Sequence, residues 1–152
     1  MPIKSALKTS LLSIRFKDFW LFSQNLVFDK ELFRHLIGRT QFIFMINHIY
    51  ESHARAKIRL FCIFINPTSI EQTVHQWIEK SIEKGVKELD LDFDPALEPF
   101  KMPFRLMDMP ALTTLKLTYC KVTRLPHDLK GLSSLKTLML RKVVLMKIAI
   151  FD

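Results

Sequence analysis

The chain has 152 residues, 49% of them hydrophobic, so it can bury a core and is not a disordered tail. Its net charge is +8, but Lys and Arg form no run of five or more, so a nucleic-acid tract is not predicted. The longest apolar run, residues 60–65, is too short to span a membrane. The 2 cysteines are too few for a disulfide scaffold. We expect a cytosolic or nuclear protein with no nucleic-acid or membrane partner.

The N-terminal region predicts a short helix over residues 5–20. Leu12, Phe16 and Trp20 recur at every fourth position and form one apolar stripe. Such a stripe is typical of a helix that packs one face against other elements of the protein.

A strand and a second helix are expected next. Leu26 and Phe28 alternate with polar or exposed positions, as in a short strand. Asp29 can then cap a helix that extends from about residue 30 to residue 52. Gly38 is the point at which this helix could break.

The following stretch predicts a strand, a helix and another strand. Residues 58–65 form an apolar run typical of a buried strand. Thr68-x-x-Glu71 fits a capping box at the start of a helix, and Gly85 lies where a left-handed stop would end it. Residues 86–93 alternate strictly and predict a strand.

The last third of the chain predicts strands joined by irregular segments. Four prolines between residues 94 and 110 exclude a long helix there. Strands are expected at 115–117 and 135–140, and residues 143–151 read as further apolar strand-like sequence.

These strands share the spacing L-x-x-L-x-L, with second anchors at Phe61, Leu89, Leu115 and Leu138. The anchors are 28, 26 and 23 residues apart, which fits the period of about 20–29 residues typical of leucine-rich repeats. The predicted fold is α/β: a leucine-rich-repeat solenoid with a curved parallel sheet, clearest at 86–145, after a short helical N-terminus. Leu115→Asp or Leu138→Asp would unfold it, because each would bury a charge between repeats.

The residues between the anchors are predicted to form the concave face of the solenoid. We interpret this face as a docking surface for a protein or a small ligand; the alternative is the ordinary solvated polarity of exposed strands. In register, Asp90 would lie beside Lys116, and Thr118 beside Arg141. The predicted binding residues are Glu88, Asp90, Asp92, Thr114, Lys116, Thr118, Thr137, Met139 and Arg141, with Leu60, Cys62 and Phe64 on the preceding strand.

No residue pattern predicts catalysis. The 5 His residues show no metal-ligand spacing with Cys, Asp or Glu. Asp90, Asp92 and Asp94 alternate along a strand, without the glycine turn and distal Glu of a calcium loop. Cys120 occupies the turn position of its repeat and is expected to be structural, whereas Cys62 has no evident role. We expect no catalytic residue, no metal and no cofactor.

Two stretches of the chain resemble a known family. Residues 74–93 contain VHQWI and GVKELDLDF, similar to a W-I…V-K-E-L-D-L-D-F signature, and LSSLKTLML at 132–140 is similar to the repeats that follow that signature. Residues 6–20, ALKTSLLSIRFKDFW, resemble the last third of an F-box, usually A-x-K-T-S-x-L-S-x-R-W-x-x-L-W. The family with these features is the plant F-box proteins with leucine-rich repeats, F-box/FBD/LRR-like.

The resemblance implies a substrate receptor of an SCF-type ubiquitin ligase. There the F-box binds a Skp adaptor on a cullin scaffold, and the repeats bind the target protein. Residues 1–24 would be a partial F-box remnant and residues 25–152 the leucine-rich-repeat region. The first F-box helices, with their L-P-x-x-x-L-x-x-I-L pattern, have no counterpart before residue 6, so a truncated or degenerate member is expected.

The adaptor-binding residues implied by the resemblance are Leu12, Phe16 and Trp20, with Phe16 in place of the usual Trp. The alternative is that these three residues only cap the core of the repeats. The predicted function is non-enzymatic protein recognition as such a receptor or a remnant of one. The alternative function is a repeat-only interaction module with no adaptor binding and no ligase role. An enzyme or a nucleic-acid binder would require a convergent polar pocket or a contiguous basic face.

Overall fold

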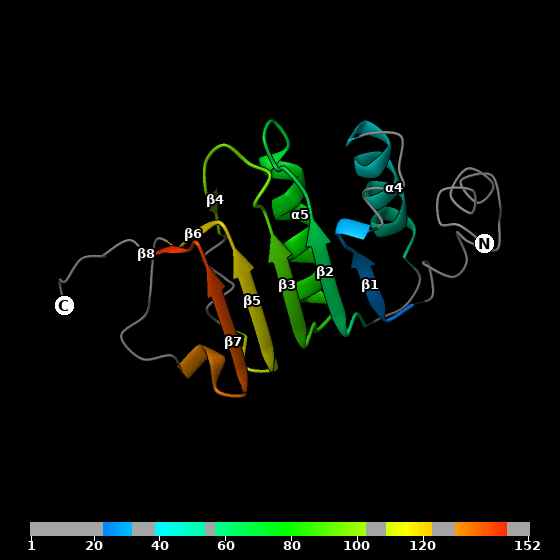
Figure 1. The fold of residues 1–152 in the computed structure, drawn as a ribbon. Coiled ribbons are helices and arrows are strands. Elements are labelled where there is room, and N and C mark those ends of the chain that lie inside the picture. Colours follow the sequence, from blue (N-terminus) through cyan, green and yellow to red (C-terminus); the bar gives the residue numbers. More distant parts are fainter. Residues whose placement is uncertain (1–22, 32–38, 54–56, 103–108, 123–129, 146–152) are drawn as a thin grey trace.

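The computed structural model describes residues 23–31, 39–53, 57–102, 109–122 and 130–145. These residues form a mixed α/β fold with two parallel sheets and two α-helices of defined bounds (Figure 1). The predicted helix over residues 5–20, with Leu12, Phe16 and Trp20, lies outside the described residues. The boundary between the N-terminal segment 1–24 and the repeat region 25–152 stays a prediction.

The larger sheet contains five parallel strands whose order follows the chain, β1-β2-β3-β5-β7. The predicted strands at these positions are therefore confirmed. The second anchors of the repeat face one another directly, because Phe61 pairs with Leu89, Leu89 with Leu115, and Leu115 with Leu138. The strands are β1 (Asn25–Phe28), β2 (Leu60–Phe64), β3 (Glu88–Asp92), β5 (Thr114–Thr118) and β7 (Thr137–Arg141).

One hydrogen-bond arrangement begins every pairing in this sheet. The backbone carbonyl of Gln24 accepts the N–H groups of Arg59 and Leu60, at 2.7 and 3.1 Å. The same pattern recurs at each later pairing: one backbone carbonyl accepts hydrogen bonds from two successive N–H groups at the start of the next strand. This repetition fixes the register, and a slip of one residue would turn every anchor toward solvent. The three later acceptors are the carbonyls of Arg59, Lys87 and Thr113.

The anchor residues point into the core, as the alternation predicts. Leu115 is 1% exposed, and its counterparts on β1, β2 and β3 are fully buried. On β7, by contrast, Leu138 is 49% and Leu140 44% exposed, because no further strand pairs with β7 among the described residues and neither α4 nor α5 covers it (Figure 1). The expectation that Leu138 is buried between repeats is therefore wrong, whereas for Leu115 it is confirmed.

Two helices cover the buried face of the first three strands (Figure 1). Helix α4 (Arg39–Ser52) places Phe42 edge-on against Phe28, with ring centroids 6.5 Å apart. Tyr50 of the same helix packs against Phe61 at 5.4 Å and stacks on Trp77 of α5 (Glu71–Glu83) at 6.4 Å. Aromatic side chains thus fill the space between the helices and the sheet. Of the helix expected from residue 30 to 52, the described part is residues 30–31 and α4.

The two ends of α5 differ in how well the sequence predicted them. The helix starts at Glu71 after Ile70, which forms no side-chain cap, so the predicted capping box at Thr68 is wrong. At the other end, Gly85 has φ +72°, and the N–H groups of Gly85 and Val86 bond back into the last turn, as predicted for a left-handed stop.

The later repeats have a small second sheet on the side where the earlier ones have helices. Each of its last two strands follows a residue with positive φ, Tyr119 (58°) or Lys142 (52°), which turns the chain out of the main sheet. The irregular returns predicted from the prolines thus include short strands. The strands are β4 (Phe100–Lys101), β6 (Cys120–Val122) and β8 (Val144–Leu145), and the 3-10 helix η2 (Lys130–Leu132) precedes β7.

The exposure difference between two equivalent anchors gives a direct test of the stacking. Leu115→Ala should lower the free energy of unfolding by about 2–5 kcal/mol, because it opens a cavity in the core. Leu138→Ala should lower it by roughly 1 kcal/mol, because half of that side chain is already in water. Urea denaturation followed by circular dichroism measures both. Equal losses would contradict the stacking order.

Candidate functional site

The side of the five-stranded sheet opposite α4 and α5 is called the open face below. The pairing register arranges its residues in three rows that cross β3, β5 and β7. The predicted contacts of Asp90 with Lys116 and of Thr118 with Arg141 hold as direct pairings. All nine residues predicted for the concave face lie here, and their role in binding stays a prediction. The rows are Glu88–Thr114–Thr137 (the lower row), Asp90–Lys116–Met139 (the middle row) and Asp92–Thr118–Arg141 (the upper row).

The chemistry of the open face changes from strand to strand. Strand β2 presents Leu60, Cys62 and Phe64, all half-buried, so the face begins with an apolar band. The next strand presents only carboxylates, and the last two present a lysine and an arginine among uncharged side chains. An incoming molecule therefore meets apolar, negative and positive groups in that order.

Part of the charge on this face is already neutralised within the protein. Arg59 forms an ion pair with Glu88 at one end of β3, and Lys142 pairs with Asp94 at 2.8 Å beyond the other end. Between them, burial raises the pKa of Asp90, and the adjacent Lys116 partly offsets that rise. These two ion pairs leave the charged side chains of the middle and upper rows available to a binding partner.

A hollow of about 250 Å³ lies in the middle and upper rows of the open face. Asp92 and Arg141 line it and form no ion pair with any residue that the structure describes; the Asp92 carboxylate accepts only the backbone N–H of Asp94. The arrangement can hold a charged or polar group, and it positions no activated nucleophile. The lining residues are Asp90, Asp92, Lys116, Leu117, Thr118, Met139 and Arg141.

Neither thiol has the environment of a nucleophile. Burial raises the pKa of Cys62 to about 12, with the neighbouring Asp90 carboxylate adding to the rise. Burial also raises the pKa of Cys120 to about 12, and its sulfur lies 3.5 Å from the carbonyl oxygen of Thr118. Both are protonated at neutral pH and unreactive as nucleophiles. Cys120 is buried directly after the turn at Tyr119, as its structural interpretation predicts.

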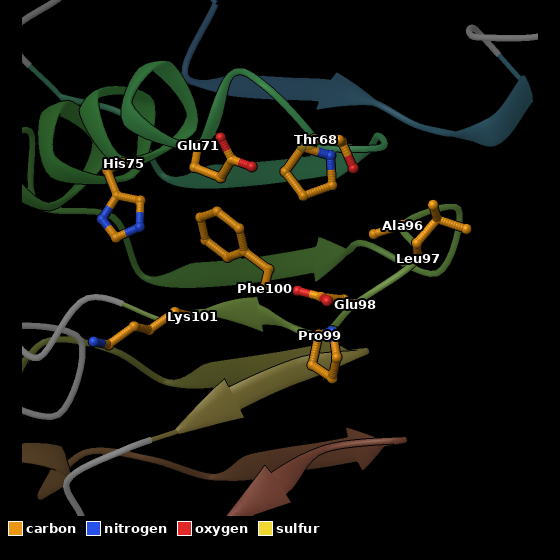
Figure 2. A pocket seen from close by; sticks show the side chains of 10 residues that line it. Thr68, Glu71, His75, Ala96, Leu97, Glu98, Pro99, Phe100 and Lys101 are labelled. Atoms are coloured by element: carbon orange, nitrogen blue, oxygen red, sulfur yellow. The ribbon is translucent and has the colours of Figure 1, made fainter.

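A second hollow, of about 410 Å³, was not predicted from the sequence (Figure 2). It lies between the start of α5, which presents Glu71 and His75, and the segment 96–101. The ring of Phe100 packs against His75 at a centroid distance of 5.0 Å and lines the hollow. Local sequence gives no signal for this site, because it joins segments from different repeats. Its charged groups are mixed in sign, and its rim includes the 87% exposed Leu97.

The described part of the chain contains neither a candidate metal site nor a membrane-spanning helix. No group of three or more His, Cys, Asp or Glu side chains there could hold a metal ion. Neither described helix is long and apolar enough to cross a membrane.

The repeated register and the polar open face define a protein of the leucine-rich-repeat class. A family model described as "FBD-associated F-box protein At5g56370, LRR repeats" matches residues 74–150, slightly more than half of the chain. The chain is also 30% identical over 143 residues to "Putative FBD-associated F-box protein At1g61330" of Arabidopsis thaliana.

The chain therefore belongs to the plant F-box/FBD/LRR family, as the sequence resemblance predicted. The match to the Arabidopsis protein covers 93% of this chain and 32% of the relative, so the chain spans about a third of that protein's length. No solved structure matches the chain.

The position of Cys62 beside Asp90 gives a test of the open face. Asp90→Asn removes a negative charge that raises the thiol pKa, so Cys62 should be alkylated several times faster at a fixed pH below about 12. In the unmodified chain, the alkylation rate should rise with pH up to that value. Mass spectrometry after iodoacetamide treatment measures the rate at each cysteine. Glu98→Gln, in the second hollow, is the control and should change nothing; equal acceleration by both variants would contradict the predicted arrangement.

Proposed function

We propose that the chain recognises a protein target with its open face, as the target-binding part of a substrate receptor of an SCF-type ubiquitin ligase. The observation that supports this most directly is the constant register, which aligns polar residues of successive strands into rows. Membership of the F-box/FBD/LRR family supports the ligase context.

If further repeats keep the same pairing register and form a solenoid, their open faces join into one elongated recognition surface. Each repeat contributes three side chains to the open face while its anchors stay in the core, so the face can vary in sequence without loss of the fold. The helices α4 and α5 lie on the other side of the sheet and leave this face accessible (Figure 1). A surface of this kind suits an extended partner that contacts several strands at once.

In this proposal the chain contributes binding and no catalysis. The ligase scaffold and the conjugating enzyme supply the ubiquitin-transfer chemistry, so the receptor needs no activated group of its own. The high pKa of both thiols is compatible with that role, because a ubiquitin thioester requires a reactive thiolate. The proposed location is the cytosol or the nucleus.

The link to the ligase is proposed to run through residues 6–20. Leu12, Phe16 and Trp20 would contact a Skp adaptor, which joins the receptor to the cullin scaffold.

A pull-down of the purified chain with a plant Skp adaptor tests this link. The chain should retain the adaptor, and Leu12→Asp should abolish retention, because it places a charge in the apolar contact. Arg141→Gln, on the open face, is the matched control and should leave adaptor binding unchanged. A relative with a complete F-box serves as the positive reference.

The opposite result has a defined meaning. A chain that folds, as judged by circular dichroism, and retains no adaptor would disprove the ligase link. Recognition by the repeats alone would then be the function, with the three N-terminal residues capping the core.

A further inference from the structure

We propose that the open face binds an extended peptide segment of the target with an apolar, a basic and an acidic side chain at alternate positions. Read across the sheet from β2 to β7, the apolar side chain comes first and the acidic one last. This inference rests on the proposed recognition function and specifies which segment that function selects.

The upper row of the open face, together with Phe64 on β2, supplies the three complementary positions. Phe64 pairs in register with Asp92, Asp92 with Thr118, and Thr118 with Arg141. The row thus presents an aromatic ring, a carboxylate, a hydroxyl and a guanidinium on four neighbouring strands. Few partners other than one with the opposite order of groups would satisfy all of them.

The first position suits an apolar side chain. Phe64 is half-buried, and the adjacent Cys62 thiol is protonated and uncharged at neutral pH, because its pKa is about 12. The ammonium group of Lys30 lies 5.8 Å from the centre of the Phe64 ring. Burial of an apolar side chain against this band removes both from water.

The second position suits a lysine or an arginine. Asp92 forms no ion pair with the described residues, and the adjacent Asp90 lies beside Lys116 in the register. Burial raises the pKa of Asp90, Lys116 opposes that rise, and the neighbouring Asp92 carboxylate adds to it. A basic side chain placed between the two carboxylates would stabilise both as anions.

The third position suits an aspartate or a glutamate. Arg141 is exposed at the edge of the 250 Å³ hollow and forms no ion pair within the described part of the chain. Asp94, whose pKa is lowered by Lys142 first and also by Arg141, forms its ion pair with Lys142 and not with Arg141. The guanidinium can therefore bind an incoming carboxylate through two parallel hydrogen bonds.

The spacing of the three positions selects an extended segment. Neighbouring strands lie about 4.8 Å apart, so Phe64 and Asp92 are roughly 5 Å apart across the sheet, and Phe64 and Arg141 are roughly 14 Å apart. Alternate residues of an extended peptide lie about 6.8 Å apart, so its first, third and fifth side chains span about 14 Å. The pattern apolar-x-basic-x-acidic, in either chain direction, matches the row within the reach of the side chains.

A random-peptide display library selected on the purified chain tests the proposal. Peptides that bind should share the apolar-x-basic-x-acidic pattern or its reverse. In fluorescence anisotropy with the best peptide, Asp92→Asn and Arg141→Gln should each weaken binding about tenfold, the loss of one charge-assisted hydrogen bond. Glu98→Gln and Lys101→Gln, which make the same kinds of change in the second hollow, should leave binding unchanged.

Charge reversal separates recognition from a general loss of structure. Arg141→Glu should abolish binding of the selected peptide, and a peptide with lysine in place of its acidic residue should restore it. Failure of this rescue, or sensitivity to the two control variants, would overturn the proposal.

The outcomes also distinguish this inference from the function on which it rests. Peptides that bind the open face without the predicted order would overturn the inference and leave target recognition in place. A folded chain that selects no peptide on the open face would overturn both.

Discussion

The shared backbone carbonyl at the start of each strand is the interaction on which the rest of the structure depends. At four successive pairings one carbonyl accepts two N–H groups from the next strand, beginning with Gln24. This contact sets where each strand begins and therefore which side chains face the core. A different starting point would move Leu89 and Leu91 to the surface and bury Asp90 and Asp92.

The fixed register also explains why the open face has an ordered chemistry. Each strand has its own charge character on the open face, and the strands pair in chain order, so a change of charge along the sequence becomes a change of charge across the sheet. The apolar β2, the acidic β3 and the more basic β5 and β7 thus form adjacent bands. Ion pairs at either end of β3 neutralise Glu88 and Asp94 and leave Asp92 as the accessible anion of the upper row.

Strand positions and much of the open face could be predicted because they depend on local periodicity. The alternation in residues 86–93 and the spacing of Leu115 and Leu117 are visible in one dimension, and the pairing of Asp90 with Lys116 follows once the repeats are aligned. The start of α5 was less predictable. Thr68-x-x-Glu71 fits a capping box, but the Thr68 hydroxyl bonds to Asn66, and the helix begins after Ile70.

The sequence by itself determined the repeat, its register, the left-handed stop at Gly85 and the family, because each rests on residue spacing or on a residue's own backbone preference. The tertiary structure decided what depends on neighbours. It buries Leu115 and leaves the equivalent Leu138 half-exposed, because an anchor is buried only where neighbouring strands or a helix cover it, as α4 does at the edge strand β1. It also creates the hollow between α5 and the segment 96–101, which exists only once separate repeats pack together.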